Sequence, residues 1–172
     1  MNLRRPPRLA HPVDALTHTA DTAHTHPAEL VIVGCSAEKT PTTTPLPALD
    51  LYDGGCVPNL RSRVGHLPHQ RSRVRFLSAA HGLVTADTRL HTYDRPLDPA
   101  RAAALRPRVW AQLQPDLFSD HTPDDILVVA EPLYLVLLTD LLSDGRRPCI
   151  HWIADHAGGW PEATAILDAW GW

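Results

Sequence analysis

The chain has 172 residues, of which 44% are hydrophobic and 20% charged, and its formal net charge is −3. This composition predicts a globular protein with a single core and argues against one that is held on nucleic acid by bulk positive charge. No apolar run approaches the roughly 20 residues of a membrane helix, and the basic start of the chain is not followed by the apolar segment of a secretory signal. The three cysteines are widely spaced, which favours free thiols and a cytoplasmic location.

Residues 1–28 are rich in Pro, His and Thr and show no clear period, so we expect a flexible arm followed by a single domain over 29–172. The arm holds several histidines, but no cysteine or acidic cluster completes a metal site around them. We therefore interpret them as part of a solvated tail: His11, His18, His24 and His26. The sequence predicts no cofactor and no metal site.

Short apolar segments predict strands over 29–34, 73–78, 125–130 and 148–153, and 79–84 reads as a turn. Helical patterns or turns occupy 48–52, 58–65, 98–113, 132–142 and 161–170. Asp98 is a plausible N-cap with Pro99 at the first helical position, and Pro107 is expected to kink that helix. The alternation of strands and helices predicts a three-layer α/β/α fold with a mainly parallel four-stranded sheet.

Polar residues follow each predicted strand, and ligands of parallel sheets bind beyond the carboxyl ends of the strands. The loop 35–39 follows the first strand. Its backbone N–H groups can hold an anion, and Lys39, the only lysine in the chain, adds a compact charge and a titratable amine. Cys35 is a candidate nucleophile if its thiolate is stabilised, and a small packing residue otherwise.

Further candidates lie after the other strands, and each has a structural alternative. Asp94 is a general base or the cap of a turn, and Glu131 is a catalytic carboxylate or a favourable charge at a helix N-terminus. His81 is an acid or base, or part of a tight turn in which Gly82 takes a positive φ. The pair at 155–156 is a weaker candidate of the same kind. The full set of expected site residues is Cys35, Lys39, Asp94 and Glu131 for catalysis, and Ser36, Tyr52, Ser78, His81, Gly82, Tyr93 and Tyr134 for substrate binding.

Four motifs in chain order resemble a family of uncharacterised bacterial and phage proteins, DUF6884. They are Cys35-Ser36 with Lys39, Ala48 with Leu51-Tyr52, Ser78-Ala79 with Gly82-Leu83, and Tyr93-Asp94 with Leu97. The first motif also resembles the archaeosine synthase domain, which is similar in fold to uracil-DNA glycosylases, and more distantly YaaA-like proteins. The resemblance implies a three-layer α/β/α domain with a pocket for a nucleobase or nucleotide.

We therefore expect an enzyme that cleaves or exchanges an N-glycosidic bond of a nucleoside or nucleotide. A carboxylate, Asp94 or Glu131, would stabilise the oxocarbenium-like transition state, and Tyr52 or Tyr134 would stack on the base. A second hypothesis is a non-catalytic module that binds nucleic acid or a modified base through arginines 61, 63, 71, 73 and 75, although a solvated surface is favoured for that stretch. A third is covalent attack on the substrate by Lys39 or Cys35.

Overall fold

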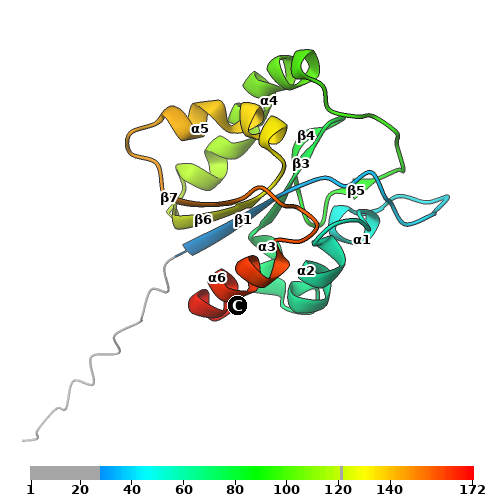
Figure 1. Cartoon of the computed structure of the whole chain (residues 1–172), viewed down its shortest axis with the longest axis horizontal. Helices are drawn as coiled ribbons and strands as arrows, with labels where there is room; N and C mark the ends of the chain where they lie inside the picture. Colours follow the sequence, from blue (N-terminus) through cyan, green and yellow to red (C-terminus); the bar gives the residue numbers. More distant parts are fainter. Residues whose placement is uncertain (1–27, 121) are drawn as a thin grey trace, which may run out of the picture.

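A computed structural model of the chain describes residues 28–120 and 122–172. Its centre is a five-stranded sheet in the order β4-β3-β1-β6-β7 (Figure 1). β1 (Ala28–Gly34), β3 (Val74–Ser78), β6 (Pro123–Val129) and β7 (Cys149–Ile153) are parallel, whereas β4 (Gly82–Thr85) is antiparallel to β3. The α/β class and the mainly parallel sheet are thus confirmed.

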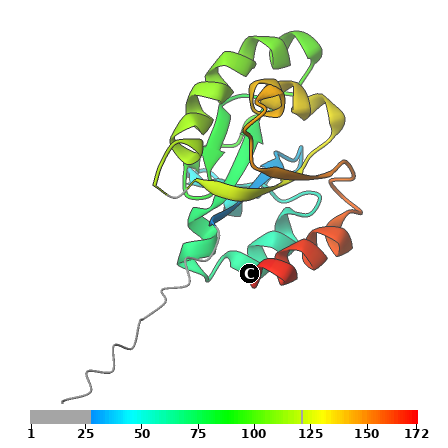
Figure 2. The same cartoon turned by 90° about the vertical axis from the view of Figure 1, so that its left-hand side faces the viewer.

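Helices cover both faces of the sheet (Figure 2). One face packs against α1 (Ala48–Leu51), α2 (Val57–Val64) and α6 (Trp160–Trp170), and the other against α4 (Pro99–Leu117), a 3₁₀ helix η1 (Pro132–Leu138) and α5 (Thr139–Ser143). The strand residues alternate between these two cores: Val31 and Val33 face the first, and Leu30 and Ile32 the second. Both faces of a central parallel strand are buried, which explains the continuous apolar run that predicted β1.

The fifth strand corrects the prediction of a turn over 79–84 and of a sheet with four strands. The chain reverses at 79–81, and β4 then pairs with β3 from Ser78↔Gly82 to Arg75↔Thr85. Gly82 has a φ of +79°, a conformation that costs a residue with a Cβ about 1–2 kcal/mol, as the turn interpretation required. In the sequence, Gly82 indicated a turn, and the few apolar residues that follow it were not enough to predict the strand β4.

The helices also depart from prediction in detail. α4 begins with the Asp98 side chain accepting from the Arg101 N–H, as expected, but it continues past Pro107 and includes Pro115. Its buried residues Leu105, Val109 and Leu113 keep contact with the sheet on both sides of Pro107, so packing offsets the missing hydrogen bond. The segment predicted as one helix over 132–142 divides into η1 and α5.

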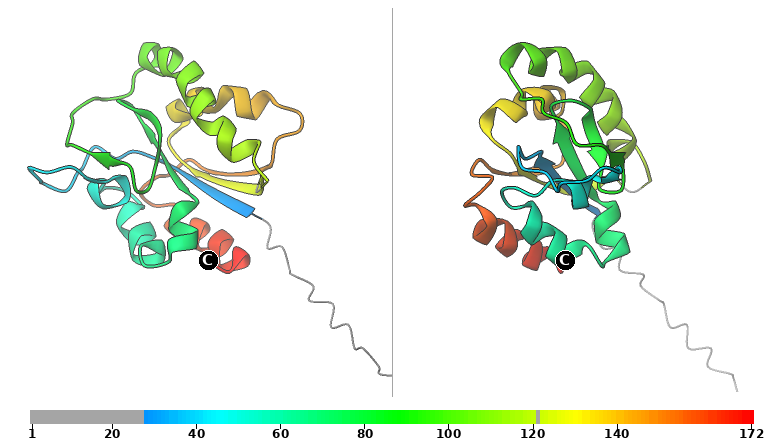
Figure 3. Two further views of the ribbon diagram at one scale, coloured as in Figure 1. Left: turned by 180° about the vertical axis from the view of Figure 1, so that it is seen from behind. Right: turned by 90° about the vertical axis from the view of Figure 1, so that its right-hand side faces the viewer.

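Smaller elements complete the fold. α3 (Pro68–Ser72) was not predicted, and neither was the short pairing of β2 (Leu46–Pro47) with β5 (Arg89–Leu90) (Figure 3). The arm predicted over 1–28 lies outside the described residues except for Ala28, which begins β1. Within residues 28–120 and 122–172, no helix is both long and apolar enough to cross a membrane.

Candidate functional site

The loop 35–39 is fixed to its neighbours by backbone and hydroxyl hydrogen bonds. The Cys35 N–H donates to the Leu77 carbonyl at 2.9 Å, which continues the β1–β3 pairing beyond the end of β1. The buried Ser36 hydroxyl donates to the Glu38 carbonyl at 2.7 Å and accepts from the Gly54 N–H at 3.1 Å. Ser36 therefore holds the shape of the loop and ties it to the segment before α2.

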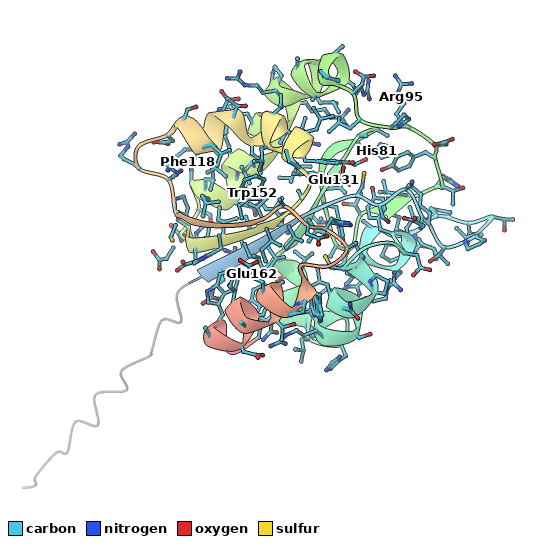
Figure 4. The ribbon with its side chains drawn as sticks, viewed as in Figure 1. His81, Arg95, Phe118, Glu131, Trp152 and Glu162 are labelled. Carbon is cyan, nitrogen blue, oxygen red and sulfur yellow. The ribbon has the colours of Figure 1, made fainter. Side chains whose placement is uncertain are left out.

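A pocket of about 570 Å³ opens beside this loop, beyond the carboxyl ends of β1, β6 and β7. Of the predicted site residues, the structure brings six to its wall: Cys35, Ser36, Lys39, Asp94, Glu131 and Tyr134. The wall also includes Gly34, Ala37, Glu38, Gly55, Arg95, Pro96, Leu97, Leu133, Ala154, Asp155, His156 and Ala157. Figure 4 shows Glu131 at the end of β6 and Arg95 on the loop before α4.

Lys39 supports the loop as well as lining the pocket. Its Nζ donates to the carbonyls of Ser36 at 3.2 Å and Ala37 at 3.3 Å, and it lies 4.3 Å from the centroid of the Tyr93 ring. An ammonium over an aromatic face is stabilised by the ring quadrupole. These contacts join the loop 35–39 to the loop after β5, so loss of Lys39 would change the shape of the pocket as well as its charge.

Cys35 pairs with Tyr134 rather than with the lysine. The Cys35 Sγ lies 3.2 Å from the Tyr134 hydroxyl, which also approaches the Cys35 carbonyl at 3.5 Å. Burial, with the nearby Cys35 as the next cause, raises the pKa of Tyr134. Tyr134 therefore stays protonated at neutral pH and is available as a hydrogen-bond donor on the pocket wall.

The remaining predicted residues lie behind the wall and not in it. Tyr52 is fully buried, so the expectation that it stacks on a base is not supported by its position. The Tyr93 hydroxyl lies 2.7 Å from both the Tyr52 hydroxyl and the Ser78 Oγ, and this Oγ accepts from the N–H groups of Ala80 and His81. Burial raises the pKa of Tyr52 to about 12 and also raises that of Tyr93. These linked hydroxyl groups of Tyr52, Tyr93 and Ser78 lie beneath the pocket residues and support them.

His81 and Gly82 belong to the β3–β4 turn. The His81 ring meets the Tyr93 ring edge-on at 5.2 Å, and its pKa is lowered first by burial and then by Arg108 and Arg101. A Cβ on Gly82 would lie 2.4 Å from the Gln112 side-chain oxygen. The structural alternative for Gly82 therefore holds, and neither residue lines the pocket.

Three carboxylates of the pocket have no partner among the residues that the structure describes. Across the described ranges 28–120 and 122–172, the carboxylates of Glu38, Asp94 and Glu131 make no hydrogen bond or ion pair. Glu131 precedes η1 but makes no side-chain cap bond, and the Asp94 side chain caps no turn. The turn-cap alternative for Asp94 is therefore not supported, whereas Glu131 does stand at the N-terminus of η1, as its structural alternative predicted. All three carboxylates are exposed and open to a ligand.

His156 is the pocket residue that the sequence signalled only weakly. Its Nε2 is buried and has no hydrogen-bond partner among the described residues, and burial is the main cause that lowers the pKa of the ring. Gly55, with φ +58°, packs against it, since a Cβ there would lie 2.1 Å from His156 Nδ1. The signal in the sequence was the position of His156 after the last strand of the sheet.

The arginines that follow α1, at positions 61, 63, 71, 73 and 75, make contacts within the molecule. Arg61 pairs with Asp53, Arg71 with Asp87 and Asp50, and Arg75 with Asp116. Arg63 pairs with Asp168, and the Arg73 Nε donates to the Glu29 carbonyl. These arginines hold helices and strands together, which leaves little support for the hypothesis that they contact phosphates.

The fold and the pocket define a three-layer α/β protein with an acidic and aromatic site at the carboxyl ends of its parallel strands. Residues 30–156 match the model of a family of unknown function, DUF6884, and the chain belongs to that family. No curated protein matches the chain. No solved structure matches it, so the more distant similarity to uracil-DNA glycosylases stays a prediction.

Proposed function

We propose that the chain is an enzyme that cleaves or exchanges the N-glycosidic bond of a nucleoside or nucleotide in this pocket. The observation that carries the proposal is the group of unpartnered carboxylates, Glu38, Asp94 and Glu131, around a pocket of about 570 Å³. Small-molecule pockets commonly range from about 300 to 1,000 Å³, which suits a nucleoside. Carboxylates bind ribose hydroxyls and stabilise the positive charge that develops on the sugar.

The pocket residues divide into sugar-facing and base-facing roles. Glu131 or Asp94 stabilises the oxocarbenium-like transition state as the bond from the anomeric carbon to the base nitrogen breaks. The bonding electron pair leaves with the base, which then takes up a proton. Tyr134 stacks on or donates to the base, and Lys39 polarises it or holds a phosphate.

Glu131 or Asp94 is the general base for the attacking water, because both side chains are exposed to solvent at the pocket. His156 also lines the pocket, but its Nε2 is buried, and burial lowers the pKa of the ring so that the imidazole is neutral at pH 7. Burial lowers the pKa of His156 and raises that of Tyr134, and the negative charge of Glu131 raises both. In hydrolysis, water gives a hydroxyl group to the anomeric carbon of the sugar, and its other proton passes to the released base. In exchange, an incoming base replaces the water.

The test is a base-release assay on a panel of nucleosides and nucleoside monophosphates, read by liquid chromatography and mass spectrometry. Glu131→Gln keeps the size of the side chain and removes the charge, so we expect turnover to fall by about a hundredfold or more. Glu162→Gln is the matched control, because Glu162 is an exposed glutamate on α6, away from the pocket (Figure 4). Equal turnover by wild type and Glu131→Gln would contradict the role of the carboxylate.

Release of no base from any panel member would contradict the proposal for small substrates. Saturable binding of a base or oligonucleotide without release would instead support the binding module. The cytoplasm is the proposed location, and the free thiols of Cys35, Cys56 and Cys149 support a reducing compartment.

A further inference from the structure

A second group of chemically active side chains lies at the other end of the sheet, where the parallel strands begin. Asp125 on β6 is paired in register with Cys149 on β7, and His151 lies two residues further along β7. Paired residues of neighbouring strands, and residues two apart in one strand, project from the same face of a sheet. The backbone therefore directs all three side chains to one face.

The ligand atoms of these residues are already close to the spacing of a metal site. His151 Nε2 lies 2.9 Å from Asp125 Oδ1 and 3.8 Å from Cys149 Sγ, and all the ligand atoms lie within 4.8 Å of one another. Tetrahedral zinc with bonds of about 2.3 Å to sulfur and about 2.0–2.1 Å to nitrogen and oxygen separates S from N by about 3.6 Å and N from O by about 3.3 Å. Shifts of a few tenths of an ångström in the His151 contacts would accommodate the ion.

The donor set itself favours zinc over the alkaline-earth cations. A thiolate, an imidazole and a carboxylate are the ligands that Zn²⁺ takes, whereas Mg²⁺ and Ca²⁺ prefer oxygen alone. One thiolate and one carboxylate balance the charge of the ion. Cys149 is exposed, so the fourth position can be filled by water.

The fold fixes the histidine independently of any ion. The His151 ring meets the Trp170 ring of α6 at 6.1 Å between centroids, and its Nε2 contacts the Asp125 carboxylate. A plain Asp–His hydrogen bond explains two of the three residues. It does not explain why the Cys149 thiol also approaches the His151 Nε2. This third donor atom is the reason to infer a metal.

We propose that Asp125, Cys149 and His151 form a zinc-binding site that links β6 to the edge strand β7. The site is separate from the pocket at the carboxyl ends of the strands, and the inference does not depend on the proposed glycosidic chemistry. Zinc bound to the folded chain stabilises it by mass action, because the ligands converge only when β6 and β7 pair.

The test titrates the reduced, full-length chain with Co²⁺ and then displaces it with Zn²⁺. Co²⁺ bound to a thiolate gives a sulfur-to-metal charge-transfer band in the near ultraviolet, which histidines alone do not give. We expect this band in the wild type, its loss in Cys149→Ser, and at least a tenfold weaker affinity in His151→Ala or Asp125→Asn, since even outer-shell changes cost 10–100-fold. Zn²⁺ should raise the melting temperature of the wild type and not that of Cys149→Ser.

Matched controls separate this site from the other thiols and histidines. Cys35→Ser and His66→Ala remove a thiol and an exposed histidine elsewhere in the described chain and should keep the band and the affinity. Absence of a thiolate band in the wild type would overturn the proposal. A band that survives in Cys149→Ser but disappears in Cys35→Ser would also overturn it and would assign the metal to the pocket.

Discussion

The two ends of the parallel sheet use the same kinds of side chain differently. Near the strand starts, charges are paired within the chain: Arg75 on β3 makes a bidentate contact with Asp116 of α4, and Asp125 contacts His151. At the carboxyl ends, Glu38 and Glu131 have no partner among the described residues. The difference indicates that charge at one end holds the layers together, whereas charge at the other end is available to a ligand.

The largest expected effect on stability comes from breaking the Arg75–Asp116 ion pair near the start of β3. Asp116→Ala leaves the Arg75 guanidinium without its carboxylate, and both side chains are largely buried, at 13% and 11% exposed. We expect a loss of about 3–5 kcal/mol in the free energy of unfolding, measured by urea denaturation. Replacing both residues together with apolar ones of similar volume should cost much less. An Asp116→Ala chain as stable as the wild type would show that the pair does not hold α4 to the sheet.

At the pocket end, Gly55→Ala tests the packing beneath His156. The residue has a φ of +58°, and a Cβ would lie 2.1 Å from His156 Nδ1. We expect a destabilisation of about 2 kcal/mol, because the conformation alone costs a residue with a Cβ about 1–2 kcal/mol and the ring must also move. Gly145→Ala is the control, since a Cβ there meets nothing within 4 Å. Base release should fall in the first variant and not in the second.

A smaller effect is expected from Tyr93→Phe, which removes the hydroxyl between Tyr52 and Ser78 and keeps the ring under Lys39. Loss of a hydrogen bond between neutral groups costs about 1 kcal/mol. Thermal or urea unfolding measures this cost. A Tyr93→Leu chain should lose more, because it also removes the aromatic face beneath the ammonium. Equal stability of the two variants would argue against a contribution from that face.

The smallest expected effect is on the pH dependence of stability. Burial lowers the pKa of His156 below its usual 6.5 in the folded state, so below pH 6.5 the unfolded chain binds more protons than the folded one. The stability contributed by the neutral ring is complete above pH 6.5 and is lost as the pH falls from there through the folded-state pKa.

His156→Gln should flatten the part of this profile that His156 causes, as measured by urea unfolding between pH 5 and 7.5. His81, whose pKa is also lowered, should supply a second part that remains. An unchanged profile in His156→Gln would mean that the ring titrates equally in the folded and unfolded chains.

The sequence by itself determined the elements with strong local signals. The apolar run of β1, the Asp98 cap and the pattern of strands alternating with helices are local properties, so they predicted a three-layer α/β fold. The rule that ligands bind at the carboxyl ends of parallel strands then brought six predicted residues to one pocket.

Only the tertiary structure decided which polar side chains are paired within the molecule and which are open to a ligand. Burial removed Tyr52 from the pocket, and the arginines after α1 are paired with acids of other segments, as Arg61 is with Asp53 and Arg75 with Asp116. It also brought Asp125 beside Cys149 and His151, which lie more than 20 positions away in the chain. Partners of this kind come from strand register and helix packing, and no local pattern in a single sequence specifies either of them.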